Sequence, residues 1–237
     1  MKRLLTSTLI AATLSLSMQT ASAEVPSELD AAIEKYILTH PEVLLKSLKS
    51  YKGKQAVTSE QYKKVIDNPD HPILGNPNGD VTLVEFFDYH CGFCKRFFPI
   101  MSQLIAEDKN LKVVFVELPI ISEDSPIAAK AALAVFALDK SKYFSFHTAL
   151  MKLSGKFEES KMVSLAKQAG LNEQMFIDMM KSDKISQQLA DNKALAEQLE
   201  VQATPTLLVG TKLVPGFMEI DKLRSTIAMA RGGDEKK

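Results

Sequence analysis

The stretch VTLVEFFDYHCGFC, residues 81–94, decides the fold of this 237-residue chain. Val81–Tyr89 is rich in β-branched and aromatic residues, which predicts a mostly buried strand that runs directly into Cys91-Gly92-Phe93-Cys94. Lys95–Lys109 is predicted as a helix kinked at Pro99, and Lys112–Ile121 as a second strand. Strand, helix and strand in this order form a βαβ unit, so both cysteines are expected at a strand-to-helix junction.

The cysteine pair is scarce as well as closely spaced. Cys91 and Cys94 are the only 2 cysteines in the chain, whereas a disulfide-stapled domain needs a density about tenfold higher. A bridge that closes so short a loop restrains the unfolded chain very little. The pair is therefore better explained by chemistry than by a structural role.

The composition is that of an ordinary globular protein. The chain has 29 basic and 29 acidic side chains, 46% hydrophobic residues and 24% charged residues, enough for one or two domains with a sizeable core. A formal charge of zero gives no electrostatic argument for nucleic acid or for an anionic membrane, so no nucleic-acid partner is expected. The absence of Trp and the 7% aromatic content also argue against a platform for stacking bases or sugars.

The first segment, residues 1–23, is predicted to be a signal peptide. Lys2 and Arg3 precede the apolar stretch Leu4–Met18, and Ala21-Ser22-Ala23 has the small residues of a cleavage site. The apolar stretch is too short and too rich in Ser and Thr to span a bilayer, which needs about 20 apolar residues. We therefore expect an exported protein in an oxidising compartment, where thiols tend to become paired.

Residues 24–66 are predicted to be helical and amphipathic. Apolar residues recur at helical spacing from Leu29 to Ile37, and Pro41 suits the first turn of a second helix. Helices this short are marginal alone, so their apolar face must pack either on the main domain or on another subunit. Residues 67–80 contain several prolines and glycines and are predicted to be a linker.

The remainder is mainly helical until residue 200. Strand character returns at Thr206–Val209 and Lys212–Val214, which flank the turn Gly210-Thr211, and a last helix is predicted over Ile220–Ala230. Residues 232–237 are expected to be a disordered tail. The stretches predicted as helices between the strands are Ala128–Leu138, Tyr143–Leu153, Ser160–Gln168, Asn172–Lys181 and Ile185–Leu199.

The position of the cysteines predicts their reactivity. The thiolate is the nucleophile in disulfide exchange, and the unpaired N–H groups and dipole of a helix N-terminus favour it at Cys91. Cys94, three residues further on, is expected to lie deeper and to resolve a mixed disulfide formed at Cys91. Lys95, Arg96 and a protonated His90 would add positive charge nearby.

Metal binding is the main alternative for the pair. A zinc site would need a second pair of ligands, and the 4 histidines provide no such motif. Two thiolates alone suit Cu(I), so a Cu(I) carrier or a surface-associated binding protein stays open as a second function class. For the exchange reaction itself, no cofactor is expected.

These features together resemble a thioredoxin fold with the helical insertion of the DsbA family. More narrowly, the chain resembles an exported subgroup with an N-terminal helical oligomerisation segment, which includes outer-membrane-associated immunogenic proteins. The resemblance implies an α/β thioredoxin-like domain over residues 81–231, with an insertion at about 122–200, after an oligomerisation segment at 24–66. The matching segments are Leu74–Asp80, Val84–Tyr89, Cys91–Lys95, Glu117–Ile120 and Ala203–Thr206.

The resemblance assigns roles to further residues. Thr204–Pro205 should be a cis peptide that faces the cysteines and offers its backbone to an extended substrate. Glu85 should lie beneath the buried cysteine and help to move its proton, although relatives often have Lys where this chain has Val116. The reaction implied is the oxidation or isomerisation of disulfides in exported proteins, with Cys91 as nucleophile and Cys94 as resolving thiol.

The resemblance also implies partners and a location. We expect a homodimer formed through residues 27–56, unfolded or wrongly bridged exported proteins as substrates, and a membrane protein that recycles the cysteines. The periplasm is the expected compartment, with association to the outer membrane or cell surface as a further expectation. Gly92-Phe93 resembles the Gly-Tyr pair of disulfide isomerases, which predicts a reduction potential of roughly −200 to −130 mV.

Overall fold

The computed structural model describes residues 27–54 and 56–233, and its contacts divide the chain into residues 1–50 and 51–237. The predicted signal peptide lies outside the described residues. In the first unit, α1 (Ser27–Thr39) is followed by α2 (Pro41–Lys54), with Pro41 at the first helical position, as predicted. The ring of His40 stacks on Tyr36 at the corner between the two helices. Large apolar side chains of these helices are exposed in the part whose side chains are described, namely Leu29, Ile33, Tyr36, Ile37, Leu38, Val43, Leu44 and Leu45.

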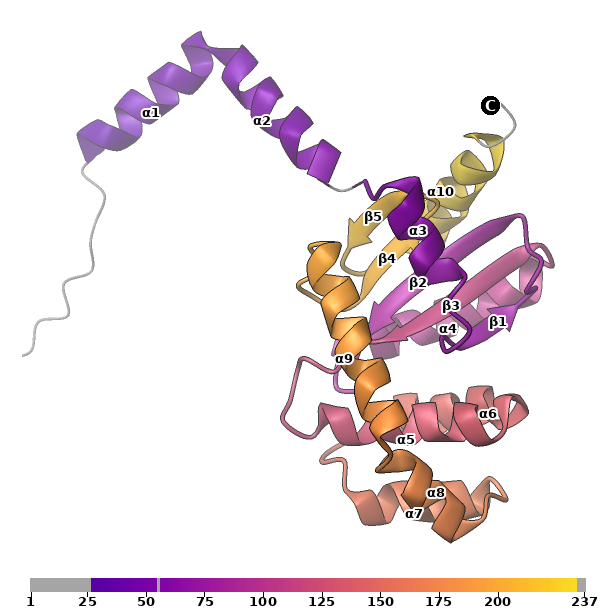
Figure 1. The fold of residues 1–237 in the computed structure, drawn as a ribbon. Coiled ribbons are helices and arrows are strands. Elements are labelled where there is room, and N and C mark those ends of the chain that lie inside the picture. Colours follow the sequence, from indigo (N-terminus) through magenta and orange to yellow (C-terminus); the bar gives the residue numbers. More distant parts are fainter. Residues whose placement is uncertain (1–26, 55, 234–237) are drawn as a thin grey trace, which may run out of the picture. The chain divides into compact units, whose positions relative to one another are not determined.

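The second unit is built on a five-stranded sheet in the order β1-β3-β2-β4-β5 (Figure 1). Strands β2 and β3 are parallel, as the βαβ prediction requires, and the other neighbours are antiparallel. Helix α4 (Gly92–Glu107) connects the two parallel strands, with Pro99 inside it. The strands are β1 (Ile73–Gly75), β2 (Val81–Phe87), β3 (Leu111–Glu117), β4 (Thr206–Val209) and β5 (Lys212–Pro215).

Side chains alternate between the two faces of this sheet. Leu83 and Phe87 of β2 pack into the larger apolar cluster with α4 and with α10 (Ile220–Gly233). Val84 and Phe86 point to the other face and join a second cluster, which includes Val65 of α3 (Ser59–Ile66). Figure 1 shows α3 on one side of the sheet and α4 on the other. Both faces of β2 are therefore covered, and all seven of its residues are buried.

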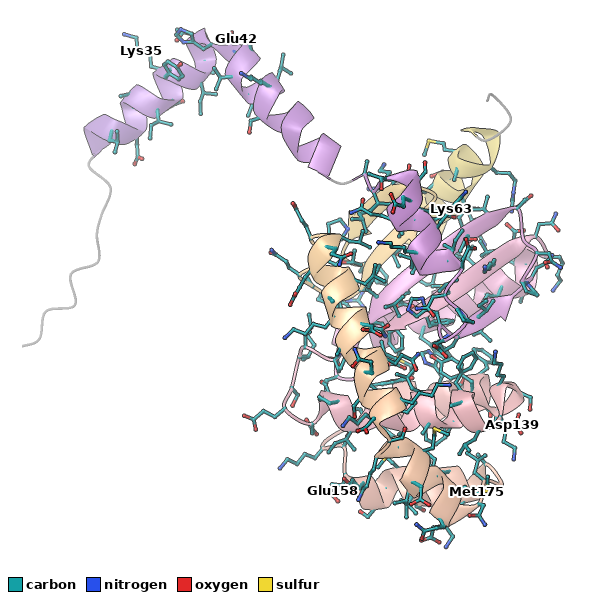
Figure 2. All side chains as sticks on the ribbon, viewed as in Figure 1. Lys35, Glu42, Lys63, Asp139, Glu158 and Met175 are labelled. Carbon is teal, nitrogen blue, oxygen red and sulfur yellow. The ribbon has the colours of Figure 1, made fainter. Side chains whose placement is uncertain are left out.

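The helical insertion contains the five helices that the sequence predicts. Helix α5 lies at its centre and contacts each of the other four. Its many alanines are almost all buried, which allows the neighbouring helices to approach closely. The side chain of Asp139, labelled in Figure 2, caps the next helix by accepting a hydrogen bond from Ser141 N. These helices are α5 (Ser125–Leu138), α6 (Lys140–Lys152), α7 (Glu159–Gln168), α8 (Glu173–Met180) and α9 (Asp183–Gln198).

The structure differs from the predicted linker at residues 67–80. This segment contains β1, which pairs with β3, and the His71 side chain is buried between Val65 O and Asn192 Oδ1. Helix α3 also belongs to the second unit, where a capping box at Thr58 starts it and Val65 is fully buried. The second unit therefore begins near residue 51, and not at residue 81.

Two smaller boundaries also differ. Strand β3 ends at Glu117, four residues before the predicted end at Ile121, because the N–H groups of Ile120 and Ile121 donate to the Asp88 carboxylate and not to a strand. Gly232 and Gly233, predicted as part of a disordered tail, are the last residues of α10. The rest of that predicted tail lies outside the described residues.

Candidate active site

Cys91 is the N-cap residue of α4, directly after the turn that follows β2. Its sulfur accepts a hydrogen bond from Cys94 N at 3.3 Å, and in the thiol form it donates to Thr204 O at 3.1 Å. Cys94 lies in the first turn of α4 and is fully buried. Both cysteines are free thiols in this structure. The sequence therefore predicted the strand-to-helix junction and the greater depth of Cys94 correctly.

The surroundings of the two thiols shift their pKa values in opposite directions. The pKa of Cys91 is lowered from 9.0 to about 6, chiefly because the Cys94 side chain forms a hydrogen bond to its sulfur. Burial of Cys91 acts in the opposite direction and is outweighed. The Thr204 side chain and the backbone amides of Cys94 and Phe93 also favour the thiolate. Burial raises the pKa of Cys94 strongly, and Cys91 and Glu85 add to that rise. At neutral pH one sulfur is thus an anion and the other a neutral thiol.

Glu85 lies beneath this pair on β2. It shares a face with Leu83 and Phe87 by strand alternation, and only 1% of its surface is exposed. Burial raises the pKa of Glu85 well above 4.5, and the charge of Cys91 raises it further. Its Oε1 has no hydrogen-bond partner within the described part of the chain. Val116, where relatives often have Lys, packs with Val84 and Phe86 on the other face of the sheet. A side chain at position 116 therefore does not lie on the face that carries Glu85.

The loop before β4 faces the cysteines from the other side. The Thr204–Pro205 peptide is cis, as predicted. Thr204 O lies 3.1 Å from the Cys91 sulfur, and Pro205 O accepts a hydrogen bond from Gly216 N at 2.8 Å, which ties the loop to the end of β5. The Thr204 hydroxyl oxygen is buried and has no hydrogen-bond partner among the described residues. It is therefore placed to donate when Cys91 ionises, which agrees with its effect on the Cys91 pKa.

Asp88 is a site residue that sequence reasoning did not identify. Its carboxylate is 1% exposed and accepts four hydrogen bonds. They come from His90 N, Ile120 N, Ile121 N and Ser125 Oγ, at 2.7–2.9 Å. One side chain thus holds together the turn before Cys91, the loop after β3 and the start of α5. The sequence did contain a sign of this role, because Asp88 is an acidic residue at the end of an apolar strand, where burial of a carboxylate without partners is costly.

A second group of buried polar side chains consists of Tyr89, Glu117 and His147, and sequence reasoning did not assign it either. The Tyr89 hydroxyl contacts Glu117 Oε1 at 3.1 Å and His147 Nδ1 at 2.8 Å. Burial is the main cause that raises the pKa of Glu117 well above 4.5, and burial alone lowers the pKa of His147 to about 3. His147 is therefore uncharged at neutral pH, and Glu117 holds a proton to higher pH than an ordinary glutamate. Glu117 on an apolar strand carried the same signal as Glu85.

The three cations predicted to support Cys91 are engaged elsewhere. His90 Nε2 lies 2.9 Å from Asp124 Oδ1, and Lys95 Nζ donates to Leu153 O at 2.5 Å. The Arg96 guanidinium lies between the rings of Phe93 and Phe217, 5.6 and 5.1 Å from their centroids. Hydrogen bonds at the helix N-terminus, and not these cations, are the causes that lower the pKa of Cys91.

Residues 27–54 and 56–233 contain no group of three or more His, Cys, Asp or Glu side chains that could hold a metal ion. Within the same residues no helix is long and apolar enough to cross a membrane.

A thiolate at the N-terminus of a helix, a buried thiol three residues later and a cis-proline loop against the first sulfur define the class of protein. The chain is a thiol-disulfide oxidoreductase with a thioredoxin fold and a helical insertion. Residues 67–228 match the family model described as thioredoxin, and the chain belongs to that family.

The relatives within the family are DsbA-like. The chain is 26% identical to disulfide bond formation protein D of Bacillus subtilis over 189 residues, which is 76% of this chain and 83% of the relative. The solved thioredoxin-like oxidoreductase from Silicibacter pomeroyi is 39% identical, with a TM-score of 0.67 over 72% of this chain and 97% of that one. The thiol-disulfide exchange protein alpha-DsbA2 from Wolbachia pipientis is 36% identical, with a TM-score of 0.68 over 76% and 96%. The resemblance to the DsbA family is thereby confirmed.

Proposed function

We propose that this oxidoreductase forms and rearranges disulfides in exported proteins, in the periplasm. The observation that carries the proposal is the asymmetry of the pair, with Cys91 ionised at neutral pH and Cys94 held as a thiol beside Glu85. An ionised outer sulfur attacks and leaves readily, and a neutral inner thiol acts only after a proton is removed from it. The predicted signal peptide and the oxidising compartment that it implies support the location.

The reaction begins when the Cys91 thiolate attacks a substrate disulfide. One substrate sulfur leaves as a thiolate and the other becomes linked to Cys91. In isomerisation, a second substrate thiolate then attacks that substrate sulfur and releases Cys91, with no net change in oxidation state. In reduction, Cys94 loses its proton to Glu85 and attacks Cys91, so the pair becomes oxidised and the substrate reduced. Substrate oxidation is the reverse of this second route.

The backbone at Thr204 and Pro205 is proposed to align the substrate during these steps. Thr204 O already lies 3.1 Å from the attacking sulfur, in the loop that leads into β4. An extended substrate segment that pairs with this backbone would bring its own sulfur to Cys91. In the thiolate form Cys91 no longer donates to this carbonyl, which frees it for the substrate.

The reduction potential is proposed to be intermediate among known exchangers. The nucleophilic cysteine has a pKa of about 7 in thioredoxin and about 3.5 in DsbA, and the value of about 6 for Cys91 lies between them. At pH 7, a pKa of about 6 in place of 9.0 stabilises the reduced pair by about 1.4 kcal/mol, or about 30 mV. We propose a potential of roughly −200 to −130 mV, to be measured by equilibration with glutathione, and a value as low as that of thioredoxin would contradict the proposal.

The first unit is proposed to join two copies of the chain through residues 27–56. Its apolar side chains are exposed, from Leu29 on α1 to Leu45 on α2, and an isolated amphipathic helix of this length is marginally stable. A dimer would hold two active sites for one wrongly bridged substrate. Deletion of residues 24–56 should give a monomer by light scattering with weaker refolding of scrambled ribonuclease. An unchanged oligomeric state after the deletion would refute this part.

Oxidase and isomerase activities can be measured separately by giving the protein two different forms of ribonuclease as substrate. Reduced ribonuclease reports oxidation and scrambled ribonuclease reports isomerisation, and Cys91→Ser should abolish both. Activity retained by Cys91→Ser would refute Cys91 as the nucleophile, and absence of both activities in the wild type would instead favour a binding function for the pair. Metal analysis of the reduced protein after loading with Cu(I) tests the Cu(I) carrier, and stoichiometric binding without exchange activity would replace the proposal. The recycling membrane partner and an association with the outer membrane remain proposals from the resemblance.

A further inference from the structure

The buried Glu117–Tyr89–His147 group lies on the same sheet face as Glu85, and the exchange steps above do not use it. In the register of β2 and β3, Glu85 pairs with Phe115 and Phe87 pairs with Glu117. The two carboxyl groups are thus carried by neighbouring strands and are offset by two residues on one face. Strand spacing and rise place their Cα atoms about 8 Å apart. Each has one oxygen, Glu85 Oε1 and Glu117 Oε2, without a hydrogen-bond partner among the described residues.

The surroundings of Glu117 contain acids and neutral donors, and no cation pairs with its carboxyl group within the described residues. From β2 and the turn after it, Glu85 and Asp88 repel its charge, and the Tyr89 hydroxyl donates to it. From α6, His147 lies 2.8 Å from Tyr89 and Tyr143 lies 3.5 Å from the same His147 nitrogen. From α9, Asn192 Nδ2 donates to the Glu117 carbonyl at 3.1 Å. The ionisation of Glu117 is therefore tied to that of Glu85.

The group has two consistent hydrogen-bond arrangements that differ by one proton. With Glu117 ionised, His147 Nδ1–H donates to Tyr89, and the Tyr89 hydroxyl donates to Glu117. With Glu117 protonated, its O–H donates to Tyr89, and Tyr89 donates to Nδ1 of the other His147 tautomer. Both arrangements satisfy the same contacts of 3.1 and 2.8 Å. A buried carboxyl that can gain or lose a proton without losing its partners is suited to share protonation with a neighbouring acid.

We propose that Glu117, held by Tyr89, is a positioning residue whose charge sets how readily Glu85 takes the proton of Cys94. This inference rests on the proposed role of Glu85. The step that it controls starts from a mixed disulfide at Cys91. The Cys94 proton moves to the Glu85 carboxylate, the Cys94 thiolate attacks the Cys91 sulfur, and the bond from Cys91 to the other sulfur breaks. That sulfur leaves as a thiolate and is reduced, while the Cys91–Cys94 pair is oxidised.

The expected size of the effect follows from two like charges in a protein interior. With the Cα separation of about 8 Å taken as the distance between the charges, and an effective dielectric constant of about 20, one carboxylate changes the ionisation constant of the other by about thirtyfold. We expect the ionisation constant of Glu85 to change by at least tenfold and by less than this full value, because Glu117 is only partly ionised when Glu85 titrates. Removing the charge of Glu117 should therefore move the ionisation of Glu85 to lower pH by about one unit or more.

The test separates the two steps of oxidation by glutathione disulfide. Rapid acid quenching and mass spectrometry follow the mixed disulfide with glutathione at Cys91 (first step) and its replacement by the Cys91–Cys94 disulfide (second step) from pH 4 to 9. For Glu117→Gln, the pH midpoint of the second step should fall by about one unit, with a rate about tenfold higher below the wild-type midpoint. The first step should be unchanged. In a Glu85→Gln background, Glu117→Gln should have no further effect.

Further variants keep the inference falsifiable. If near-ultraviolet circular dichroism shows that Glu117→Gln does not fold, Tyr89→Phe tests the inference instead. Loss of the Tyr89 hydroxyl keeps Glu117 protonated, so the pH midpoint of the second step should move in the same direction. Thr226→Val, which removes a buried hydroxyl from α10, should leave both steps unchanged. An unshifted midpoint, or an equal shift in the Glu85→Gln background, would overturn the inference while exchange stands. Absence of the first step in the wild type would instead overturn the exchange function itself.

Discussion

The Cys94 side chain should control the ionisation of Cys91, and Cys94→Ala is the perturbation that tests this. Hydrogen bonding from Cys94 is the largest single cause of the low Cys91 pKa. A hydrogen bond to a charged group contributes about 1.5–3 kcal/mol, and a thiol is a weak donor, so the lower end of that range applies. Losing it should raise the Cys91 pKa by about one pH unit, from about 6 to about 7.

The assay is the pH dependence of thiolate absorbance and of alkylation by iodoacetamide in the reduced protein. At pH 6, about half of wild-type Cys91 is ionised, and about a tenth should remain ionised in Cys94→Ala, so alkylation should slow about fivefold. Cys94→Ser is the matched control, because its hydroxyl keeps a donor beside Cys91 and the midpoint should stay at or below that of the wild type. A midpoint that Cys94→Ala does not move would refute the reasoning and leave the backbone amides as the cause.

Three further results follow from the same geometry. Thr204→Val removes a hydroxyl beside the Cys91 sulfur, and the pH midpoint of thiolate absorbance should rise by less than in Cys94→Ala. A larger rise would contradict the stronger influence of Cys94 than of Thr204 on the Cys91 pKa. A folded-state pKa below the unfolded value stabilises the fold at high pH, and this stabilisation is lost as pH falls through the folded pKa. The unfolding free energy of the reduced wild type, relative to Cys91→Ser, should therefore increase by about 3 kcal/mol between pH 6 and pH 9, and a flat difference in urea titrations would exclude the shift. Asp88→Asn places a donor against N–H groups that now donate to the carboxylate, and should lower the unfolding free energy by about 2–4 kcal/mol, whereas a loss below about 0.5 kcal/mol would show that the four contacts are not stabilising.

The sequence predicted the elements with strong local patterns. The apolar strand into Cys91, the helix that follows and the five insertion helices are all present, because each has its own periodicity and stop signals such as Gly170, which has a positive φ of 74° at the end of α7. The cis peptide at Thr204–Pro205 was implied by the family resemblance and not by any local rule.

The features that sequence reasoning missed depend on contacts between distant segments. Strand β1 is three residues long within a stretch rich in Pro and Gly, and only its pairing with β3 defines it. Three of the four partners of Asp88 lie beyond the next strand, and His147 reaches Tyr89 from the insertion. Buried acids on apolar strands were a readable signal, and it was used for Glu85 alone. The same argument applied to Glu117 would have identified the second carboxyl group.

The central claim is that Cys91 is the attacking sulfur and Cys94 the resolving one. The most direct measurement traps the intermediate: reduced Cys94→Ala and Cys91→Ala are each mixed with a peptide that contains one disulfide, quenched with acid and analysed by mass spectrometry. The account predicts that Cys94→Ala accumulates a stable mixed disulfide at Cys91 at pH 7, and that Cys91→Ala forms none because Cys94 is buried and protonated. A mixed disulfide on Cys94, or none on Cys91, would contradict it.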